Sequence, residues 1–130
     1  IEIHGTLRQV ACLQCNYRVA MAVVLKRLAD GEEDPDCPDC GGILKSATIS
    51  FGQSLVAKDL ARAEQAAREC DLLLAVGSTL SVFPVAGLVP LARKAGARVV
   101  IINAEPTAMD EFGDAVLMGD IELLLPQLIV

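Results

Sequence analysis

A short apolar run closed by a Gly-Ser-Thr turn is the feature that most constrains how this chain can fold. Residues 72–76 (LLLAV) follow Asp71 and lead into Gly77-Ser78-Thr79. An unbroken apolar run of this length, bounded by turn residues, is typical of a strand buried on both faces of a parallel sheet. A second run, residues 98–103 (RVVIIN), follows an Ala-rich segment of helical length. Together they predict a strand-helix-strand unit with a right-handed crossover.

Polar residues stand at the ends of both predicted strands. Gly77, Ser78 and Thr79 follow the first strand, and Asn103 ends the second. Ligands of parallel sheets bind at the carboxyl ends of the strands, so this edge is a candidate binding site. From the pattern alone, both groups are equally well explained as ordinary turn residues.

The rest of the chain alternates between helical and extended patterns. Helices are predicted over residues 19–31, 58–70, 84–95 and 121–128, with a loop or short helix at 107–112. Extended segments are predicted at residues 1–10 (a short strand leading to His4-Gly5), 43–51 and 115–117. The predicted fold class is α/β, a Rossmann-like parallel sheet with a small inserted cysteine module. We expect three parts: residues 1–10, 11–42 and 43–130.

Composition limits both the core and the partners. With 130 residues, the chain suits one domain, or one domain with a small metal-stabilised module. Its residues are 53% hydrophobic but only 3% aromatic, so the core must be aliphatic. The net charge of -6 argues against direct binding of nucleic acid through a general basic surface. It is compatible with a cationic partner such as a lysine-bearing peptide.

The sequence predicts an intracellular protein that does not enter a membrane. No apolar run reaches the roughly 18 residues that a bilayer span requires. The first residues, Ile-Glu-Ile-His, lack the basic and then apolar pattern of a signal peptide. We therefore expect a cytoplasmic, reducing location, where close cysteine pairs favour metal binding over disulfides.

Four of the five cysteines form two matched pairs. They are Cys12, Cys15, Cys37 and Cys40, with two residues between the members of each pair. This spacing lets a tight turn aim two sulfurs at one ion, and two such pairs favour a structural Zn²⁺ site. A redox motif and a pair of disulfides are the alternatives. Cys70 lies at the end of a predicted helix, where a free cysteine is usually a small hydrophobe, and it is assigned no role.

Six motifs, in this order, resemble the sirtuin family of NAD-dependent protein deacylases. They are residues 3–6 (IHGT), the two cysteine pairs, residues 49–52 (ISFG), 77–84 (GSTLSVFP), 102–105 (INAE) and 119–121 (GDI). The resemblance is to the later part of a sirtuin. The family's opening glycine-rich segment with Asp-Phe-Arg, and its Gln-Asn-x-Asp segment, are not in this sequence. We expect an N-terminal half or another chain to supply them.

The resemblance implies that the chain removes acyl groups from protein lysines. In the family reaction, the acyl oxygen of a modified lysine attacks the ribose carbon that bears nicotinamide, and the acyl group ends on ADP-ribose. His4 matches the catalytic histidine, which acts as a general base on a ribose hydroxyl. Without the resemblance, a single histidine would more often be a structural or surface residue. The reaction uses no metal-bound water, which agrees with a closed zinc site.

The resemblance also implies two sets of binding residues. For NAD they are Gly77, Ser78, Thr79, Asn103, Glu105, Asp120 and Ile121. For an acylated-lysine protein or peptide they are Ile49, Ser50, Phe51, Gly52 and Val82. Two departures from the family stand out: Ser78 and Thr79 occur in reversed order, and Gln53 replaces a common Glu. Phe51 could equally be a core residue.

Two other classes of function remain open. One is a non-catalytic module that binds NAD or acylated peptides without turnover. The other is a Rossmann-like cofactor domain of a different enzyme, such as the central domain of thiamine-dependent enzymes. The two cysteine pairs and His4 argue against the second class.

Overall fold

The computed structural model describes residues 1–128, which fall into two compact units. The N-terminal unit comprises Glu2–Val56, and the C-terminal unit comprises residues 57–128 together with Ile1. Among the described residues, every helix falls short of the length and apolarity that crossing a bilayer requires.

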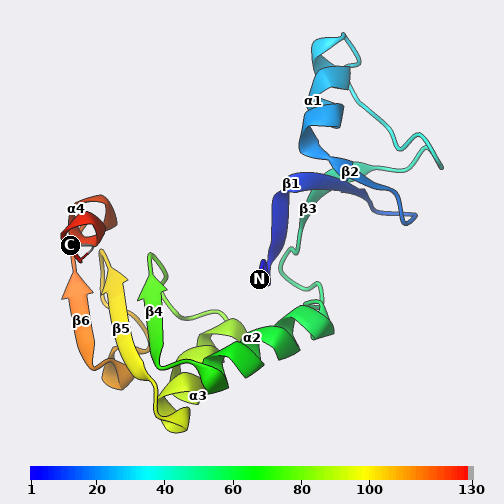
Figure 1. The fold of residues 1–130 in the computed structure, drawn as a ribbon. Coiled ribbons are helices and arrows are strands. Elements are labelled where there is room, and N and C mark those ends of the chain that lie inside the picture. Colours follow the sequence, from blue (N-terminus) through cyan, green and yellow to red (C-terminus); the bar gives the residue numbers. More distant parts are fainter. Residues whose placement is uncertain (129–130) are drawn as a thin grey trace. The chain divides into compact units, whose positions relative to one another are not determined.

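The N-terminal unit is a three-stranded antiparallel sheet with one helix (Figure 1). The strand order is β2-β1-β3, so β1 pairs on both sides. Val10 on β1, Val24 on the helix and Ala47 on β3 are buried and form its small apolar interior. The elements are β1 (Gly5–Cys12), β2 (Arg18–Ala20), α1 (Met21–Ala29) and β3 (Leu44–Thr48).

Two predictions for this unit are wrong in detail. The strand predicted to lead to His4 is a turn, in which the Gly5 N–H donates to the Glu2 carbonyl oxygen over 2.9 Å, and β1 begins only at Gly5. The predicted helix begins at Met21 rather than Val19, because Val19 pairs with Val10 in the sheet. Tertiary pairing overrides the helical pattern at this position.

The unit also extends beyond the predicted cysteine module of residues 11–42. The sequence prediction places residues 44–48 in the Rossmann-like part, yet β3 pairs with β1: Cys12 lies opposite Leu44, and Gly5 lies opposite Thr48. The boundary between the compact units consequently falls after Val56.

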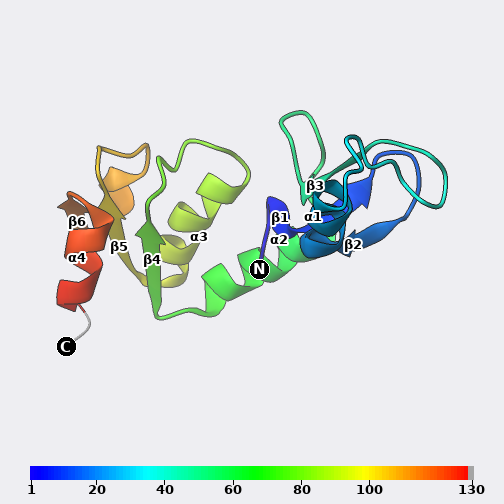
Figure 2. The same cartoon turned by 90° about the horizontal axis from the view of Figure 1, so that it is seen from above.

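The C-terminal unit is a three-stranded parallel sheet, as predicted, with the strand order β4-β5-β6 and with helices packed against it. α3 lies along one face of the sheet and contacts β4 and β5 (Figure 2). The predicted helix over residues 84–95 is divided into a 3-10 turn and α3. The elements are α2 (Ala57–Glu69), β4 (Leu72–Val76), η1 (Val85–Gly87), α3 (Leu88–Ala95), β5 (Arg98–Asn103), η2 (Asp110–Phe112), β6 (Ala115–Met118) and α4 (Ile121–Leu128).

Burial differs sharply between the two apolar strands. On β5, the central strand, Val99, Ile101 and Ile102 are completely buried, as predicted for a strand covered on both faces. On β4, Leu72 and Leu74 are 54% and 48% exposed, so the same prediction is wrong for β4. β4 pairs with β5 only and is an edge strand of the sheet within residues 1–128.

Asp114 connects three elements of the C-terminal unit. Its Oδ2 accepts the Val99 N–H over 2.9 Å, and its carboxylate accepts the Arg93 guanidinium at the end of α3 over 2.6 and 2.7 Å. Its own N–H donates to the Val99 carbonyl oxygen over 2.8 Å. The Val99 amide and then the Arg93 guanidinium lower the pKa of the Asp114 carboxyl. The anion therefore stabilises the junction of α3, β5 and β6.

Replacing Asp114 with Asn is expected to destabilise the C-terminal unit at neutral pH, because the charge that Arg93 and the Val99 amide favour is lost. The folded pKa is lowered, so the wild-type carboxylate contributes fully above its unfolded pKa of about 3.9 and loses this contribution as the pH falls through the folded value. Urea unfolding should therefore show a difference between wild type and variant that shrinks in strong acid.

Asp59→Asn is the matched control, since Asp59 lies in the first turn of α2, where its one ion pair, with the exposed Arg62 at 3.2 Å, should contribute little to stability. A difference between wild type and Asp114→Asn that stays constant down to strong acid would contradict this account.

Candidate functional site

The four paired cysteines converge in the N-terminal unit. Their Sγ atoms all lie within 4.8 Å of one another. Cys12 and Cys40 are 3.6 Å apart at sulfur, as are Cys15 and Cys37. Sulfurs placed tetrahedrally at about 2.3 Å from Zn²⁺ would be roughly 3.8 Å apart, so the cluster fits one such ion. All four positions are filled by thiols, which leaves no open coordination position for catalysis.

Tight turns hold each pair of thiols. The Gln14 N–H donates to Cys12 Sγ over 3.3 Å, and the Tyr17 N–H donates to Cys15 Sγ over 3.4 Å. In the second pair, the Gly41 N–H donates to the Cys37 carbonyl oxygen over 2.8 Å. Amide donors of this kind orient metal-binding sulfurs and favour their thiolate form.

Gly42 shows how closely the backbone packs on this cluster. A Cβ at this position would lie 3.0 Å from Cys12 Sγ and 2.9 Å from Gln14 Oε1. A larger residue at position 42 would therefore displace the Gln14 side chain and crowd the Cys12 thiol.

The thiols differ in how readily they ionise. The Gln14 amide lowers the pKa of Cys12 to about 7. The Tyr17 amide acts in the same direction on Cys15, but burial and the neighbouring thiols outweigh it and raise the pKa of Cys15 to about 12. Four thiols at this separation resist full deprotonation because their charges repel. A divalent cation among them compensates that charge and displaces the protons.

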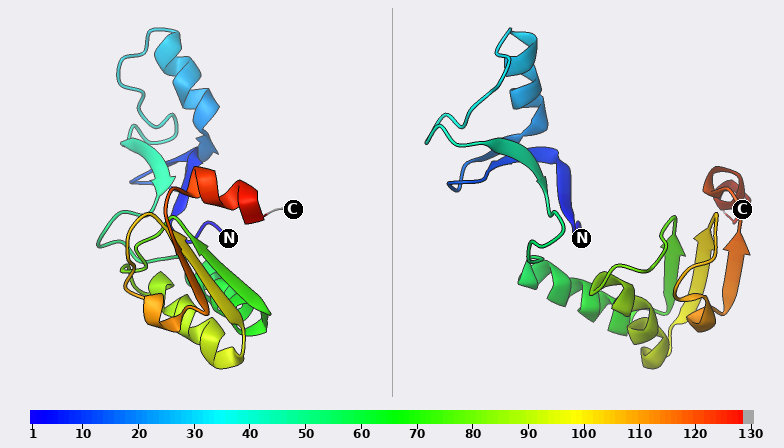
Figure 3. Two further views of the ribbon diagram at one scale, coloured as in Figure 1. Left: turned by 90° about the vertical axis from the view of Figure 1, so that its left-hand side faces the viewer. Right: turned by 180° about the vertical axis from the view of Figure 1, so that it is seen from behind.

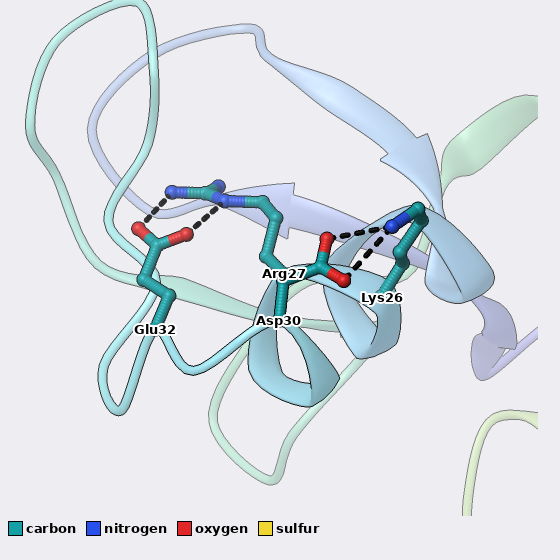
Figure 4. A network of polar contacts seen from close by, with 4 residues as sticks. All are labelled: Lys26, Arg27, Asp30 and Glu32. Carbon is teal, nitrogen blue, oxygen red and sulfur yellow. Dashed lines mark hydrogen bonds and ion pairs between the residues drawn. The ribbon is translucent and has the colours of Figure 1, made fainter.

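Ion pairs hold the acidic loop that leads from α1 to the second cysteine pair (Figure 4). Lys26 binds Asp30 over 2.6 Å, and the Arg27 guanidinium binds Glu32 over 2.5 Å. Arg27 also donates to the Asp36 carbonyl oxygen over 2.9 Å, directly before Cys37. The pKa of Glu32 is lowered by Arg27. The Arg27 contacts therefore tie the end of α1 to the start of the second pair.

The β1–β3 ladder connects the cysteine cluster to the predicted catalytic residue. Cys12 ends β1, and His4 directly precedes the first residue of the same strand. The Ile49 N–H, just after β3, donates to the His4 carbonyl oxygen over 2.8 Å. The structure thus brings His4 next to the predicted substrate segment within one unit.

The predicted substrate segment forms a closed turn. The Ser50 N–H donates to Gln53 Oε1 over 2.8 Å, and the Gln53 N–H donates to the Ser50 carbonyl oxygen over 3.0 Å. Phe51 and Gly52 lie between them, and Phe51 is 95% exposed, so it is not a core residue here. The sequence pattern does not predict that the Gln53 side chain closes this turn, because helical and strand periodicities say nothing about bonds from a side chain to the backbone.

The predicted cofactor residues lie at or just after the ends of β4, β5 and β6. These three parallel strands of the C-terminal unit are drawn in Figures 1 and 3. The Gly77 N–H donates to the Ile102 carbonyl oxygen over 2.9 Å, and the Gly119 N–H donates to the Asn103 carbonyl oxygen over 3.0 Å. Gly77 has φ +63, and a Cβ there would meet Ile121 Cδ1 at 3.4 Å. The ends of β4, β5 and β6 and the start of α4 therefore share one edge.

The polar side chains of this edge are mostly exposed, and several are already engaged. Ser78 Oγ accepts the Leu80 N–H over 3.2 Å, and Thr79 Oγ1 lies 2.8 Å from Ser81 Oγ. Asn103 Nδ2 donates to the Glu105 carbonyl oxygen over 2.8 Å. Asp120 Oδ1 accepts the Glu122 N–H over 2.8 Å and so caps α4. Val82, predicted to contact substrate, is 43% exposed in this unit.

Comparisons with known proteins show which family this chain resembles. A family model described as the Sir2 family matches residues 1–84. NAD-dependent protein deacetylase 2 of Streptomyces coelicolor is 46% identical over 129 residues, covering 99% of this chain. The solved structure of Sir2Tm bound to a propionylated peptide superposes with a TM-score of 0.89 at 26% identity, covering 99% of this chain and 54% of that one. A Sir2 structure with a p53 peptide and NAD⁺ gives 0.88 at 26% identity, covering 99% and 53%.

The chain spans about half the length of the curated relatives it matches: 54% of the Streptomyces protein and 47% of a Bradyrhizobium deacetylase. The match excludes a cofactor domain of an unrelated enzyme, because it includes both cysteine pairs and His4 within one family model. The sirtuin resemblance is confirmed, and the chain belongs to the Sir2 family.

Proposed function

We propose that this chain is the zinc-binding and later cofactor-binding part of an NAD-dependent protein-lysine deacylase. The observation that carries the proposal is the placement of His4 beside Ile49, at the end of the ladder that the cysteine cluster holds. The relatives' names and the peptide- and NAD-bound relatives support the reaction class. Because the chain spans only part of those proteins, activity requires the groups that lie in the rest of their length.

His4 is proposed as the general base. It is exposed, and it is the only histidine of the chain. An imidazole accepts a proton near neutral pH, and its role would be to take the proton of a ribose hydroxyl. NAD, when bound, would supply the ribose carbon that becomes electrophilic as nicotinamide leaves.

The residues proposed to hold NAD are Gly77, Ser78, Thr79, Asn103, Glu105, Asp120 and Ile121. Their shared edge supports this role, because hydroxyls and backbone amides at the carboxyl ends of parallel strands suit ribose and phosphate oxygens. Gly77 admits close approach of a ligand to the backbone, and Ile121 provides apolar surface next to it.

In the N-terminal unit, the acylated lysine is proposed to bind along Ile49, Ser50, Phe51 and Gly52. In the C-terminal unit, Val82 is proposed as a substrate-binding residue. The exposed ring of Phe51 supports this role, since it offers apolar surface for an acyl chain and the stem of a lysine. The backbone beside it can pair with an extended peptide. Gln53 is engaged in closing the turn, so its exchange for the family's usual Glu leaves the turn acceptor in place.

A structural Zn²⁺ held by Cys12, Cys15, Cys37 and Cys40 completes the proposal. Thiolate coordination requires reduced cysteines, which supports a cytoplasmic location.

The β4 edge, with Leu72 and Leu74 exposed, is proposed as the surface that receives the N-terminal half of a Sir2 protein or another chain. We propose no nucleic acid and no membrane as partners.

Replacing His4 with Ala is expected to lower nicotinamide release from NAD and an acetyl-lysine peptide by roughly a hundredfold or more, because general-base catalysis contributes that much. The assay uses this chain and the longest natural polypeptide that contains it. Gln9→Ala, an exposed change on β1, is the control and should keep full activity.

Equal turnover in wild type and His4→Ala would remove His4 from catalysis. NAD binding without any nicotinamide release, in the longest polypeptide, would instead establish the non-catalytic binding module.

One zinc ion per chain is expected by elemental analysis of purified protein, and replacing any one of the four paired cysteines with Ser should remove it. A strong chelator should unfold the N-terminal unit, because its apolar interior is too small to hold it without the metal. Cys70→Ser is the matched control, since Cys70 lies outside the cluster and should leave the zinc content unchanged. Full zinc content after loss of both Cys37 and Cys40 would rule out this site.

A further inference from the structure

The turn after β4 contains a leucine in a backbone conformation that favours glycine. Leu80 has φ +52, and it is the one non-glycine residue with positive φ among residues 1–128. Such a conformation persists only where surrounding contacts hold it, and it often marks a functional segment. Leu80 directly follows Ser78 and Thr79, so whatever holds Leu80 also sets the shape of the proposed NAD turn.

The loop between β5 and η2 supplies those contacts. The Ala108 N–H donates to the Thr79 carbonyl oxygen over 3.0 Å. The next residue, Met109, is 7% exposed and belongs to the buried cluster against which Leu80 packs. Two consecutive residues of this loop therefore support the turn: Ala108 through a backbone hydrogen bond, and Met109 as a member of the apolar cluster on which Leu80 packs.

Thr107 and Asp110 lock this loop from both sides. The Thr107 hydroxyl donates to Asp110 Oδ1 over 2.5 Å, and the Thr107 N–H donates to Asp110 Oδ2 over 3.1 Å. The same hydroxyl oxygen accepts the Met109 N–H over 3.2 Å. Ala108 and Met109 lie between Thr107 and Asp110, so the hydrogen bonds between these two residues (the Thr107–Asp110 lock) orient the groups that support the turn. Thr107 and Asp110 are half-buried.

The same loop begins at the second proposed NAD segment. Asn103 ends β5, and its Nδ2 donates to the Glu105 carbonyl oxygen two residues before Thr107. The segment 104–110 thus joins Asn103 to the Ser78–Thr79 turn through bonded contacts within one unit.

We propose that Thr107 and Asp110 are positioning residues of the NAD site. They act through Ala108 and Met109, which keep the Thr79 carbonyl and Leu80 in place and so pre-form the turn that binds NAD. The inference rests on the proposed function, because it concerns the same site.

The test compares Thr107→Val, which removes the hydroxyl but keeps the β-branch, with Thr107→Ser, which keeps the hydroxyl. Asp110→Ala removes the partner, and Glu111→Ala, an exposed neighbour, is the control. In the longest natural polypeptide that contains the chain, the KM for NAD should rise roughly tenfold or more in Thr107→Val and Asp110→Ala. In these two variants the KM for the acetyl-lysine peptide should stay near the wild-type value. Thr107→Ser, which keeps the hydroxyl, and Glu111→Ala, the control, should both keep the wild-type KM for NAD.

A second readout does not need activity. Amide hydrogen exchange in this chain should be faster at Ala108 in Thr107→Val than in wild type, while exchange at Val99 in the core strand is unchanged. Thr107→Ser should protect Ala108 as wild type does.

Three results would overturn the inference, and they are distinguishable. An unchanged KM for NAD and unchanged exchange at Ala108, while His4→Ala is inactive, would leave the proposed function standing without this positioning role. A parallel rise of both KM values with a fall in Tm would mean general destabilisation. Wild-type protein that neither binds NAD nor releases nicotinamide would remove the proposed function and this inference together.

Discussion

The convergence of four thiols is the constraint on which the N-terminal unit depends. Its buried apolar side chains are few and small, with Val10, Val24 and Ala47 the main contributors. A unit with so little apolar burial needs a further source of stability, and metal coordination supplies it in domains of this size. The thiols come from the end of β1 and from the turn before β3, so a bound ion fastens these strands together. The distant end of the same ladder carries His4 and Ile49. The four-cysteine site thereby helps to position His4, the candidate general base, without contacting it.

In the C-terminal unit, a buried central strand brings the candidate binding residues together. β5 is completely buried at Val99, Ile101 and Ile102, and its in-register neighbours bring three strand ends to one edge. Backbone bonds from Gly77 and Gly119 link that edge laterally. Most of the polar residues at this edge are exposed, while the apolar side chains of β5 are buried. Parallel strands leave such an edge available for ligands by their topology.

Several features could be predicted from local pattern because local physics decides them. The cysteine spacing, the apolar run of β5 and the end of α3 at Ala95 are of this kind. Other features depended on partners distant in sequence. Val19 belongs to a strand because Val10 pairs with it. On β4, Leu73 packs against the core while Leu72 and Leu74, on the other face of the strand, stay exposed. The predicted division of the chain into parts differs from the compact units for the same reason, because no residue near Leu44 predicts that Leu44 pairs with Cys12.

The sequence by itself determined the chemistry: four thiols in matched pairs, one imidazole, and hydroxyl and amide side chains after two apolar strands. These follow from residue type and spacing, and together with motif order they identified the family. Only the tertiary structure decided which of these groups meet. It placed the thiols within 4.8 Å of one another and set His4 beside Ile49. It also joined Thr107 and Asp110 into the lock behind the Thr79 turn. Such contacts depend on strand register and loop closure, which no single stretch of residues encodes.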